Sequence, residues 1–128
     1  REAEKEMLDY TSANKITFIP FFPLAAGLLA GKYDKDTKFE DLRANLPFYQ
    51  EDQFKENLEK VDKLTELAKK YDEEVAQIVL AFYLTRPSLD VIIPGAKKGE
   101  QIEANMRAAD IELDPKDVEY IDEIFKIN

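Results

Sequence analysis

The 128-residue sequence carries 27 acidic and 18 basic side chains, a formal net charge of −9, and neither histidine nor cysteine. This acidic balance argues against a nucleic-acid or anionic-membrane surface, because phosphate groups attract clustered lysine and arginine. Without histidine these residues form no Ser-His-Asp triad or His-ligated metal site, and without cysteine they form no disulfide or thiolate metal site. We expect one globular, cytoplasmic domain at most, with no membrane span and no bound metal.

The predicted elements begin with a helix over residues 1–13, whose apolar residues recur at helical spacing. Residues 16–22, "ITFIPFF", are mostly β-branched or aromatic, which predicts a short, buried parallel strand. Pro20 is awkward in that strand because it cannot donate to a ladder. Residues 23–49 show no clean period, so we expect a long loop with a helical turn near 26–30.

The second half of the chain predicts further helices and a second strand. A helix is expected over 51–70, and another over 72–85 with Asp72 as its N-cap. The second of these is apolar nearly all round, so it should be buried. Residues 89–95, "LDVIIPG", form the second predicted strand, and a helix follows over about 100–109.

The last predicted helix starts with Asp114 as N-cap and Pro115 at the first helical position. Strands that alternate with helices indicate an α/β fold with two parallel strands and about five helices. Two strands do not make a complete sheet, and the sequence lacks an initiator methionine. Both features lead us to expect a piece of a longer protein.

No catalytic constellation emerges from the polar residues. The carboxylates of the middle helices fall on solvent faces, where pairs such as Glu56 and Lys60 are typical of a helix surface. Ser12 and Ser88 have no base available, and Asp90 is more simply explained as a polar strand entrance. We therefore predict neither a catalytic nor a metal site within the chain.

The segment 91–106, "VIIPGAKKGEQIEANM", is a candidate binding site. A helix that starts after the Pro-Gly turn presents unpaired N–H groups that favour phosphate. Lys97 and Lys98 add positive charge there, and Gln101 and Asn105 lie four residues apart on one helical face. From spacing alone, an ordinary hydrophilic loop followed by a polar helix face is an equally good interpretation.

The loop after the first predicted strand is a second candidate. In "FFPLAAGLLAGKY" the small residues Ala25, Ala26 and Gly27 follow the strand directly, where backbone can approach a ligand. Lys32 and Arg43 are cations that a returning loop could bring to a phosphate. A well-packed turn is the alternative. Because both loops follow parallel strands, where α/β folds bind ligands, together they favour a phosphate-containing ligand.

At these two loops the sequence resembles the C-terminal part of the aldo-keto reductases. The motifs are "IPFFPLAAGLLAGKY" and "VIIPGAKKGEQIEANM", in the same order and about sixty residues apart, and the bacterial and potassium-channel β-subunit-like branches are the most similar. The resemblance covers essentially all 128 residues. It implies part of a (β/α)8 TIM barrel: helix 6, strand 7, helix 7, strand 8, helix 8 and the C-terminal helix, without the N-terminal part.

The resemblance also implies that NADPH binds across both loops. Five residues of the first loop would line the cofactor pyrophosphate: Phe22, Pro23, Leu24, Ala25 and Gly27. Phe22 stands where relatives commonly have serine, so only a backbone contact is expected there. Lys32 and Arg43 match family positions that help to clasp the cofactor.

In the second loop, the residues implied to meet the adenosine end are Gly95, Lys97, Lys98, Gln101 and Asn105. The glycine and the lysines would face the 2′-phosphate region. The two amides would face the 2′-phosphate side and the adenine. Ala104 stands where many relatives have a glutamate that contacts adenine.

The family's catalytic Asp, Tyr, Lys and His lie on earlier strands, so none is expected in this chain. The resemblance implies a full-length enzyme that reduces a small-molecule aldehyde or ketone by hydride transfer from NADPH, while the chain alone is inactive. Two alternatives stay open. The parent is a nucleotide-sensing regulatory protein with little turnover, or the chain is an oligomerising piece that self-associates through exposed strand edges.

Overall fold

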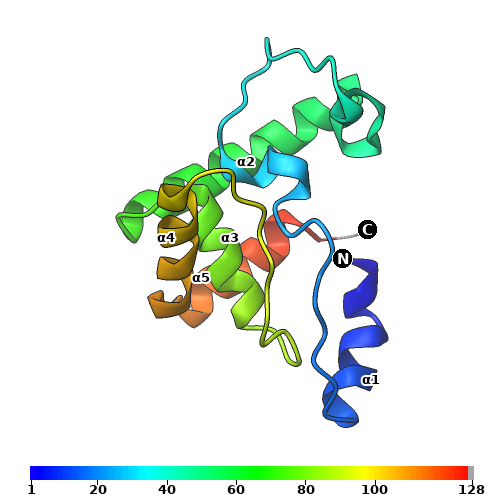
Figure 1. The fold of residues 1–128 in the computed structure, drawn as a ribbon, viewed down its shortest axis with the longest axis vertical. Helices are drawn as coiled ribbons and strands as arrows, with labels where there is room; N and C mark the ends of the chain where they lie inside the picture. The colour runs from blue at the N-terminus through cyan, green and yellow to red at the C-terminus, as the bar shows by residue number, and fades with distance from the viewer. Residues whose placement is uncertain (127–128) are drawn as a thin grey trace.

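The computed structural model describes residues 1–126. Within them lie five α-helices (Figure 1), namely α1 (Met7–Ala13), α2 (Glu51–Lys70), α3 (Val75–Leu84), α4 (Gly99–Arg107) and α5 (Pro115–Ile124). Short 3-10 turns add to them at Glu2–Glu4, Ala25–Ala30, Leu42–Asn45, Pro47–Tyr49 and Ala108–Asp110. In this part of the chain, no helix is both long and apolar enough to cross a membrane.

Several predicted helices are confirmed. Helix α2 has the predicted bounds, and α5 starts at Pro115 with Asp114 at the N-cap position. The predicted helix over 1–13 is α-helical only in its second half. The turn predicted near 26–30 is present as a 3-10 turn with a kink inside it.

The predicted start of α3 is wrong. Glu74, not Asp72, is its N-cap, and Asp72 has a left-handed backbone with φ of 53°. The N–H of Glu73 donates to the carbonyl of Ala68 at 3.2 Å, and that of Asp72 donates to Lys69 at 3.2 Å. This pair of bonds closes a helix C-terminus, and it requires a left-handed residue at position 72. The residue predicted to start one helix therefore ends the previous one.

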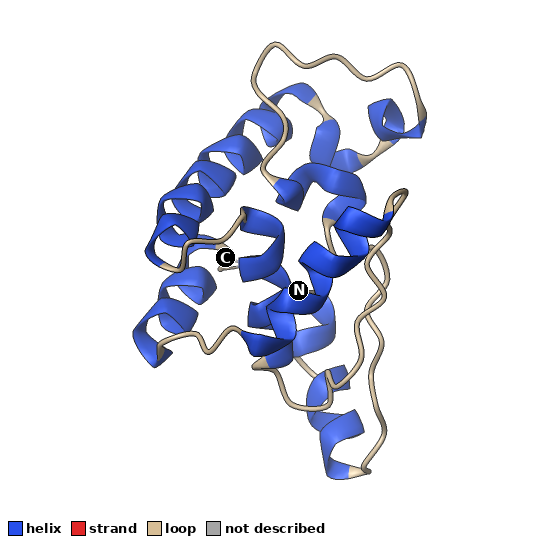
Figure 2. Cartoon of the chain, turned by 60° about the vertical axis from the view of Figure 1, so that its left-hand side comes forward, coloured by secondary structure: helices blue, strands red, loops and turns tan. Residues whose placement is uncertain are grey.

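The two predicted strands are not confirmed. No strand is present in residues 1–126, and Figure 2 shows only helices and loops there. Among the described residues, segment 16–22 makes one backbone hydrogen bond toward the second segment, from Phe18 N–H to the carbonyl of Ser88 at 2.7 Å, and Ser88 lies just before residues 89–95. A strand exists through repeated pairing with a neighbour, and Pro20 lacks a donor for it.

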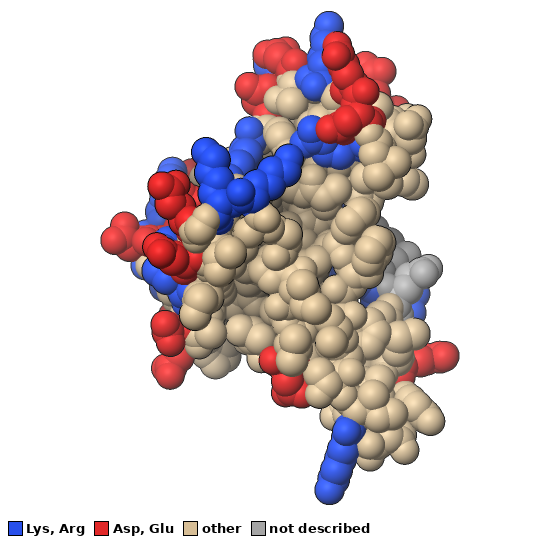
Figure 3. Space-filling view, in the orientation of Figure 1, with Lys and Arg blue, Asp and Glu red and all other residues tan. Residues whose placement is uncertain are grey.

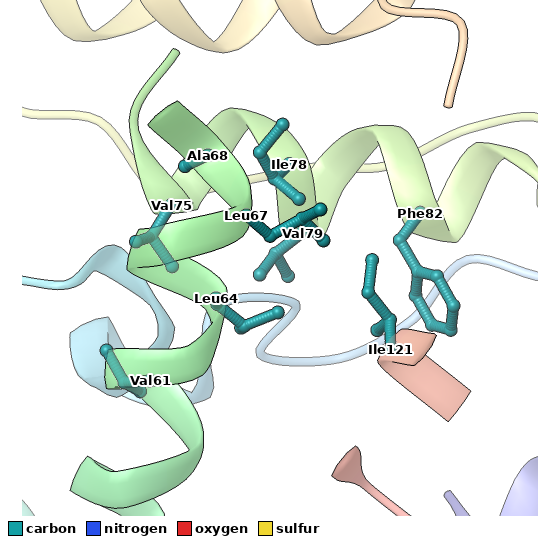
Figure 4. Close-up of a cluster of buried hydrophobic side chains, with 9 residues drawn as sticks. All are labelled: Val61, Leu64, Leu67, Ala68, Val75, Ile78, Val79, Phe82 and Ile121. Atoms are coloured by element: carbon teal, nitrogen blue, oxygen red, sulfur yellow. The ribbon is translucent and has the colours of Figure 1, made fainter. Parts of the chain in front are cut away.

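The main hydrophobic core lies between α2, α3 and α5 (Figure 4). Leu64 of α2 and Ile78 of α3 are completely buried, and Ile121 of α5 is 2% exposed. Helix α3 is buried along most of its length, as its all-round apolar sequence predicts. Together the core consists of Val61, Leu64, Leu67, Ala68, Val75, Ile78, Val79, Phe82 and Ile121.

A second, aromatic cluster orders the long loop between residues 23 and 49. Its buried members are Leu28, Tyr49 and Phe54, against which Tyr33 and Phe39 pack. The rings meet mainly edge to face, with the centroids of Phe39 and Tyr49 4.5 Å apart and those of Tyr33 and Phe39 5.0 Å apart. Such contacts stabilise a loop beyond the area that they bury. The loop predicted to be irregular therefore has its own small core.

The end of α2 is tied to the start of α5 by polar contacts. Lys70 Nζ donates to the carboxylates of Asp114 at 2.5 Å and Asp117 at 2.7 Å, and the Tyr71 hydroxyl also donates to Asp117. Burial opposes ionisation of Asp117, but the hydrogen bonds from Lys70 and Tyr71 outweigh it and lower its pKa. Asp114 holds the N-cap position of α5 without a side-chain cap bond.

Several large apolar side chains are exposed. Phe21 is 87% exposed, and others include Ile16, Ile19, Phe22, Val91, Ile93, Ile102 and Met106. Ile93, Ile102 and Met106 line a groove of about 420 Å³ between α3, the segment before α4, and α4 itself. Figure 3 shows a largely uncharged surface over α3 and this segment, with lysine and arginine side chains gathered above it.

Candidate cofactor-binding site

The first candidate loop has an unusual backbone. Phe22, Ala25 and Ala26 have φ values of 52°, 48° and 53°, and Gly27 has a φ of 100°. Left-handed backbone is rare for residues with a Cβ and costs roughly 1–3 kcal/mol at each position. Strain of this kind clusters at ligand-binding loops, where it holds the backbone in one shape. The geometry therefore agrees with a loop built for close backbone approach.

Some residues of this loop pack into the protein, and others lie at its surface or beneath Tyr33. Pro23 is buried and Leu24 packs against the main core, so packing accounts for both. Phe22 is 42% exposed and stacks on Phe21, with ring centroids 4.2 Å apart. Gly27 lies beneath Tyr33, since a Cβ on Gly27 would be 2.8 Å from the Tyr33 hydroxyl. Any larger residue at position 27 would displace the ring that covers it.

Arg43 is a predicted cation of the site that is held by several side-chain hydrogen bonds. Its Nε donates to both carboxylate oxygens of Asp41 at 2.9 and 3.1 Å, and its Nη2 donates to Asp41 at 2.6 Å. Its Nη1 donates to the Tyr33 hydroxyl at 2.5 Å, and its guanidinium carbon lies 4.8 Å from the centre of the Phe39 ring. Lys32, the other predicted cation of this loop, is exposed.

The second candidate loop leads into α4. Gly95, Lys97, Lys98 and Gly99 are exposed, and a Cβ added at either glycine would meet nothing within 4 Å. Lys98 is the N-cap residue of α4 and makes no side-chain cap bond. The start of α4 is therefore open to a ligand, with two lysines beside it.

The two predicted amide ligands differ in their surroundings. The Gln101 side-chain oxygen accepts a hydrogen bond from the Lys97 N–H at 2.7 Å, so its carbonyl stabilises the loop while its NH₂ group can donate to a ligand. Asn105, one turn later on the same face, is half-buried and lines the apolar groove. Ala104 is half-buried and has no polar group to offer.

The Asp41–Arg43 pair is held by its own hydrogen bonds. Hydrogen bonds from Arg43 lower the pKa of Asp41 to about 2. The same bonds raise the pKa of Arg43. Arg43 and Lys97 belong to separate loops, and their binding of one ligand stays a prediction.

Sequence reasoning missed the residues that support Arg43. Asp41, two positions before the arginine, forms an ion pair with it. The Tyr33 hydroxyl accepts a hydrogen bond from Arg43, and the Phe39 ring packs against the guanidinium. The available signal was the spacing Asp-x-Arg within a loop rich in aromatic residues. Ser88 and Asp90 serve structural contacts: the Ser88 and Thr11 hydroxyls lie 2.7 Å apart, and Asp90 accepts a bond from Thr17 at 3.3 Å.

Comparisons with known sequences identify the family of the chain. The Aldo/keto reductase family model matches residues 1–126. Aldo-keto reductase YhdN from Bacillus subtilis (strain 168) is 39% identical over 107 residues, which span 81% of this chain and 32% of YhdN. Aldo-keto reductase yakc from Schizosaccharomyces pombe, whose name includes NADP(+), is 33% identical across 86% of this chain and 33% of its own length.

A probable voltage-gated potassium channel subunit beta from Oryza sativa subsp. japonica is 32% identical across 86% of this chain and 35% of its own length. The chain therefore spans about a third of the length of these curated relatives. The resemblance to the bacterial and channel-subunit branches is confirmed.

A solved structure shows the same arrangement of elements. The glycerol dehydrogenase AKR11B4 from Gluconobacter oxydans superposes with a TM-score of 0.89 at 28% identity, over 97% of this chain and 38% of the dehydrogenase chain. This likeness fits the chain as part of a (β/α)8 barrel. The family match over residues 1–126, the relatives and the superposition lead to one conclusion: the chain belongs to the Aldo/keto reductase family.

Proposed function

We propose that the chain forms the NADPH-binding part of an aldo-keto reductase that reduces aldehydes or ketones to alcohols. The observation that carries this proposal is the open start of α4, where Lys97 and Lys98 are exposed and no described side chain caps the helix. NADPH carries a pyrophosphate and a 2′-phosphate, and paired cations favour such groups. The NADP(+) in the name of yakc supports the choice of nucleotide.

The described residues fit the parts of this cofactor. The strained backbone around Ala25 and Gly27 would lie along the pyrophosphate, with the Tyr33 ring covering Gly27 on one side. Lys97 and Lys98 would bind the 2′-phosphate at the open start of α4, and Asn105 would lie toward the adenine. When bound, NADPH supplies a hydride to the carbonyl carbon of the substrate. The proton donor for that reaction would come from residues beyond these 128.

This proposal predicts selective nucleotide binding without turnover. In a fluorescence titration, we expect the 128-residue chain to bind NADPH roughly 10-fold or more tightly than NADH, because charge-assisted contacts to the extra phosphate contribute about 1.5–3 kcal/mol. With a panel of aldehydes, NADPH oxidation should stay at the buffer rate. Equal affinity for both nucleotides would refute the cofactor assignment, and oxidation above the blank would refute the inactivity of the isolated chain.

We also propose that the isolated chain self-associates through its exposed apolar side chains. Phe21 and Ile93 are 87% and 66% exposed, and water contact with large apolar side chains is unfavourable. In multi-angle light scattering at micromolar concentration, we expect a mass above that of the monomer.

The substitution Phe21→Ser should shift this mass toward the monomer, because it removes the ring of Phe21, which is 87% exposed. Leu42→Ser is the matched control, since Leu42 is 68% exposed but lies in the loop between 23 and 49. A monomeric wild-type chain would contradict the proposal. Equal shifts for the two variants would place the contact elsewhere on the surface.

A further inference from the structure

The Arg43 guanidinium is fixed from three sides by residues of its own loop. Asp41 accepts bonds from the edge formed by Nε and Nη2, and the Tyr33 hydroxyl accepts one from Nη1. The Phe39 ring lies under the guanidinium, 4.8 Å from its carbon to the ring centre. An arginine side chain loses about 2 kcal/mol of rotamer entropy when it becomes ordered. These contacts restrict Arg43 before any ligand binds.

These contacts leave part of the guanidinium available. An arginine side chain has five N–H donors, one on Nε and two on each Nη. Asp41 takes the Nε–H and one hydrogen of Nη2, and Tyr33 takes one hydrogen of Nη1. One N–H remains on each Nη atom. Asp41 thus occupies the edge formed by Nε and Nη2, and the remaining N–H groups can donate to a second oxyanion.

The loop that holds Arg43 is itself anchored to the strained backbone. The Tyr33 hydroxyl, which binds Arg43, lies over Gly27 at the distance where a Cβ would collide with it. The Tyr49 hydroxyl donates to the carbonyl of Ala26 at 3.2 Å. The tyrosines join the arginine to the first candidate loop, so the position of Arg43 is set relative to that backbone.

We propose that Asp41 and Tyr33 are positioning residues that hold Arg43 ready for a phosphate oxygen of the cofactor. This inference rests on the proposed function. An opposite role, in which Asp41 competes with phosphate for Arg43, would require the carboxylate to occupy the remaining N–H groups. It occupies the edge formed by Nε and Nη2 instead. Positioning and competition predict opposite changes in affinity when Asp41 is neutralised.

The first test needs no ligand. ¹⁵N relaxation of the arginine Nε–H groups reports how rigid each guanidinium is in the free chain. Arg43 should be more rigid than Arg107, whose contacts with Glu73 are longer, at 3.3 and 3.4 Å. The variant Asp41→Asn should make Arg43 as mobile as Arg107. If wild-type Arg43 is already as mobile as Arg107, the inference is overturned whatever the nucleotide results are.

The second test measures nucleotide affinity. Asp41→Asn and Tyr33→Phe should each weaken NADPH binding on the order of 2- to 10-fold, the cost of immobilising one flexible side chain on binding. Asp36→Asn is the matched control, because it removes the same charge from the same exposed loop without touching Arg43. The control should bind NADPH as well as or slightly better than the wild type. Tyr33→Phe leaves the net charge unchanged, so a change in its NADPH affinity does not come from altered charge.

The outcomes separate this inference from the proposed function. If the wild type binds NADPH and both variants bind equally well or better, the positioning role is wrong and the cofactor site stands. If the wild type binds no nucleotide, the proposed site fails, and the relaxation data alone decide whether Asp41 orders Arg43. Equal losses for NADPH and NADH assign Arg43 to the pyrophosphate, whereas a loss for NADPH alone assigns it to the 2′-phosphate.

Discussion

Replacement of Leu64 by alanine is expected to lower the free energy of unfolding by about 2–5 kcal/mol. Leu64 is completely buried between α2 and α3, in the centre of the main core (Figure 4). Its truncation removes apolar contacts and leaves a cavity that the helices fill only in part. Urea denaturation monitored by far-UV circular dichroism measures the change.

The matched control for this substitution is Leu42→Ala. Leu42 is 68% exposed, so the same chemical change should alter the free energy of unfolding by no more than about 0.5 kcal/mol. A loss of less than 1 kcal/mol for Leu64→Ala would contradict the core described here. So would equal losses for the two variants.

The double substitution Lys97→Gln/Lys98→Gln is expected to weaken NADPH binding roughly 10- to 50-fold, through the loss of charge-assisted contacts with the 2′-phosphate. Both lysines are exposed at the start of α4, where helical N–H groups also favour an anion. NADH lacks the 2′-phosphate, so its affinity should change much less. Parallel fluorescence titrations with the two nucleotides measure the difference.

A control must separate this local effect from the change in net charge. Lys63→Gln/Lys116→Gln also removes two exposed cations, but from α2 and α5. We expect its NADPH affinity to stay within about 2-fold of the wild type in 0.15 M salt, where distant charges are largely screened. Equal losses for NADPH and NADH in the α4 variant would move the lysines from the 2′-phosphate to another part of the cofactor.

The Leu64 substitution and the double lysine substitution affect different parts of the chain. The core of α2, α3 and α5 holds the scaffold together, whereas the proposed nucleotide contacts come from loops that lead into the 3-10 turn at Ala25–Ala30 and into α4. The aromatic cluster around Tyr49 connects the long loop to the backbone of Ala26. A substitution in either loop is therefore expected to change binding more than stability.

Elements with strong local signals could be predicted from the sequence. The bounds of α2 follow from its apolar period, and the start of α5 follows from Pro115, because the fixed φ of proline suits the first helical position. The interior position of α3 follows from its apolar residues on every side. Periodicity and proline geometry act within a few residues, so no distant partner is needed to express them.

Elements that depend on distant partners could not be predicted in the same way. The segments 16–22 and 89–95 have strand-like composition, yet a strand needs a neighbour that pairs along its length. Within residues 1–126, the first segment makes a single backbone bond in this direction, to Ser88 just before the second segment. Aspartate is a common N-cap residue, which is why the sequence predicts that Asp72 starts a helix. The backbone bonds from residues 72 and 73 to α2 show instead that Asp72 follows the C-terminus of that helix.

The candidate site shows the same division. The sequence alone identified two loops with small residues and cations, and its motifs pointed to the aldo-keto reductases. Only the tertiary structure decided how those side chains are used. It pairs Arg43 with Asp41, places Tyr33 over Gly27, and turns the Gln101 oxygen to the backbone of Lys97. Charge and size are properties of single residues, whereas hydrogen-bond partners depend on which loops the fold brings together.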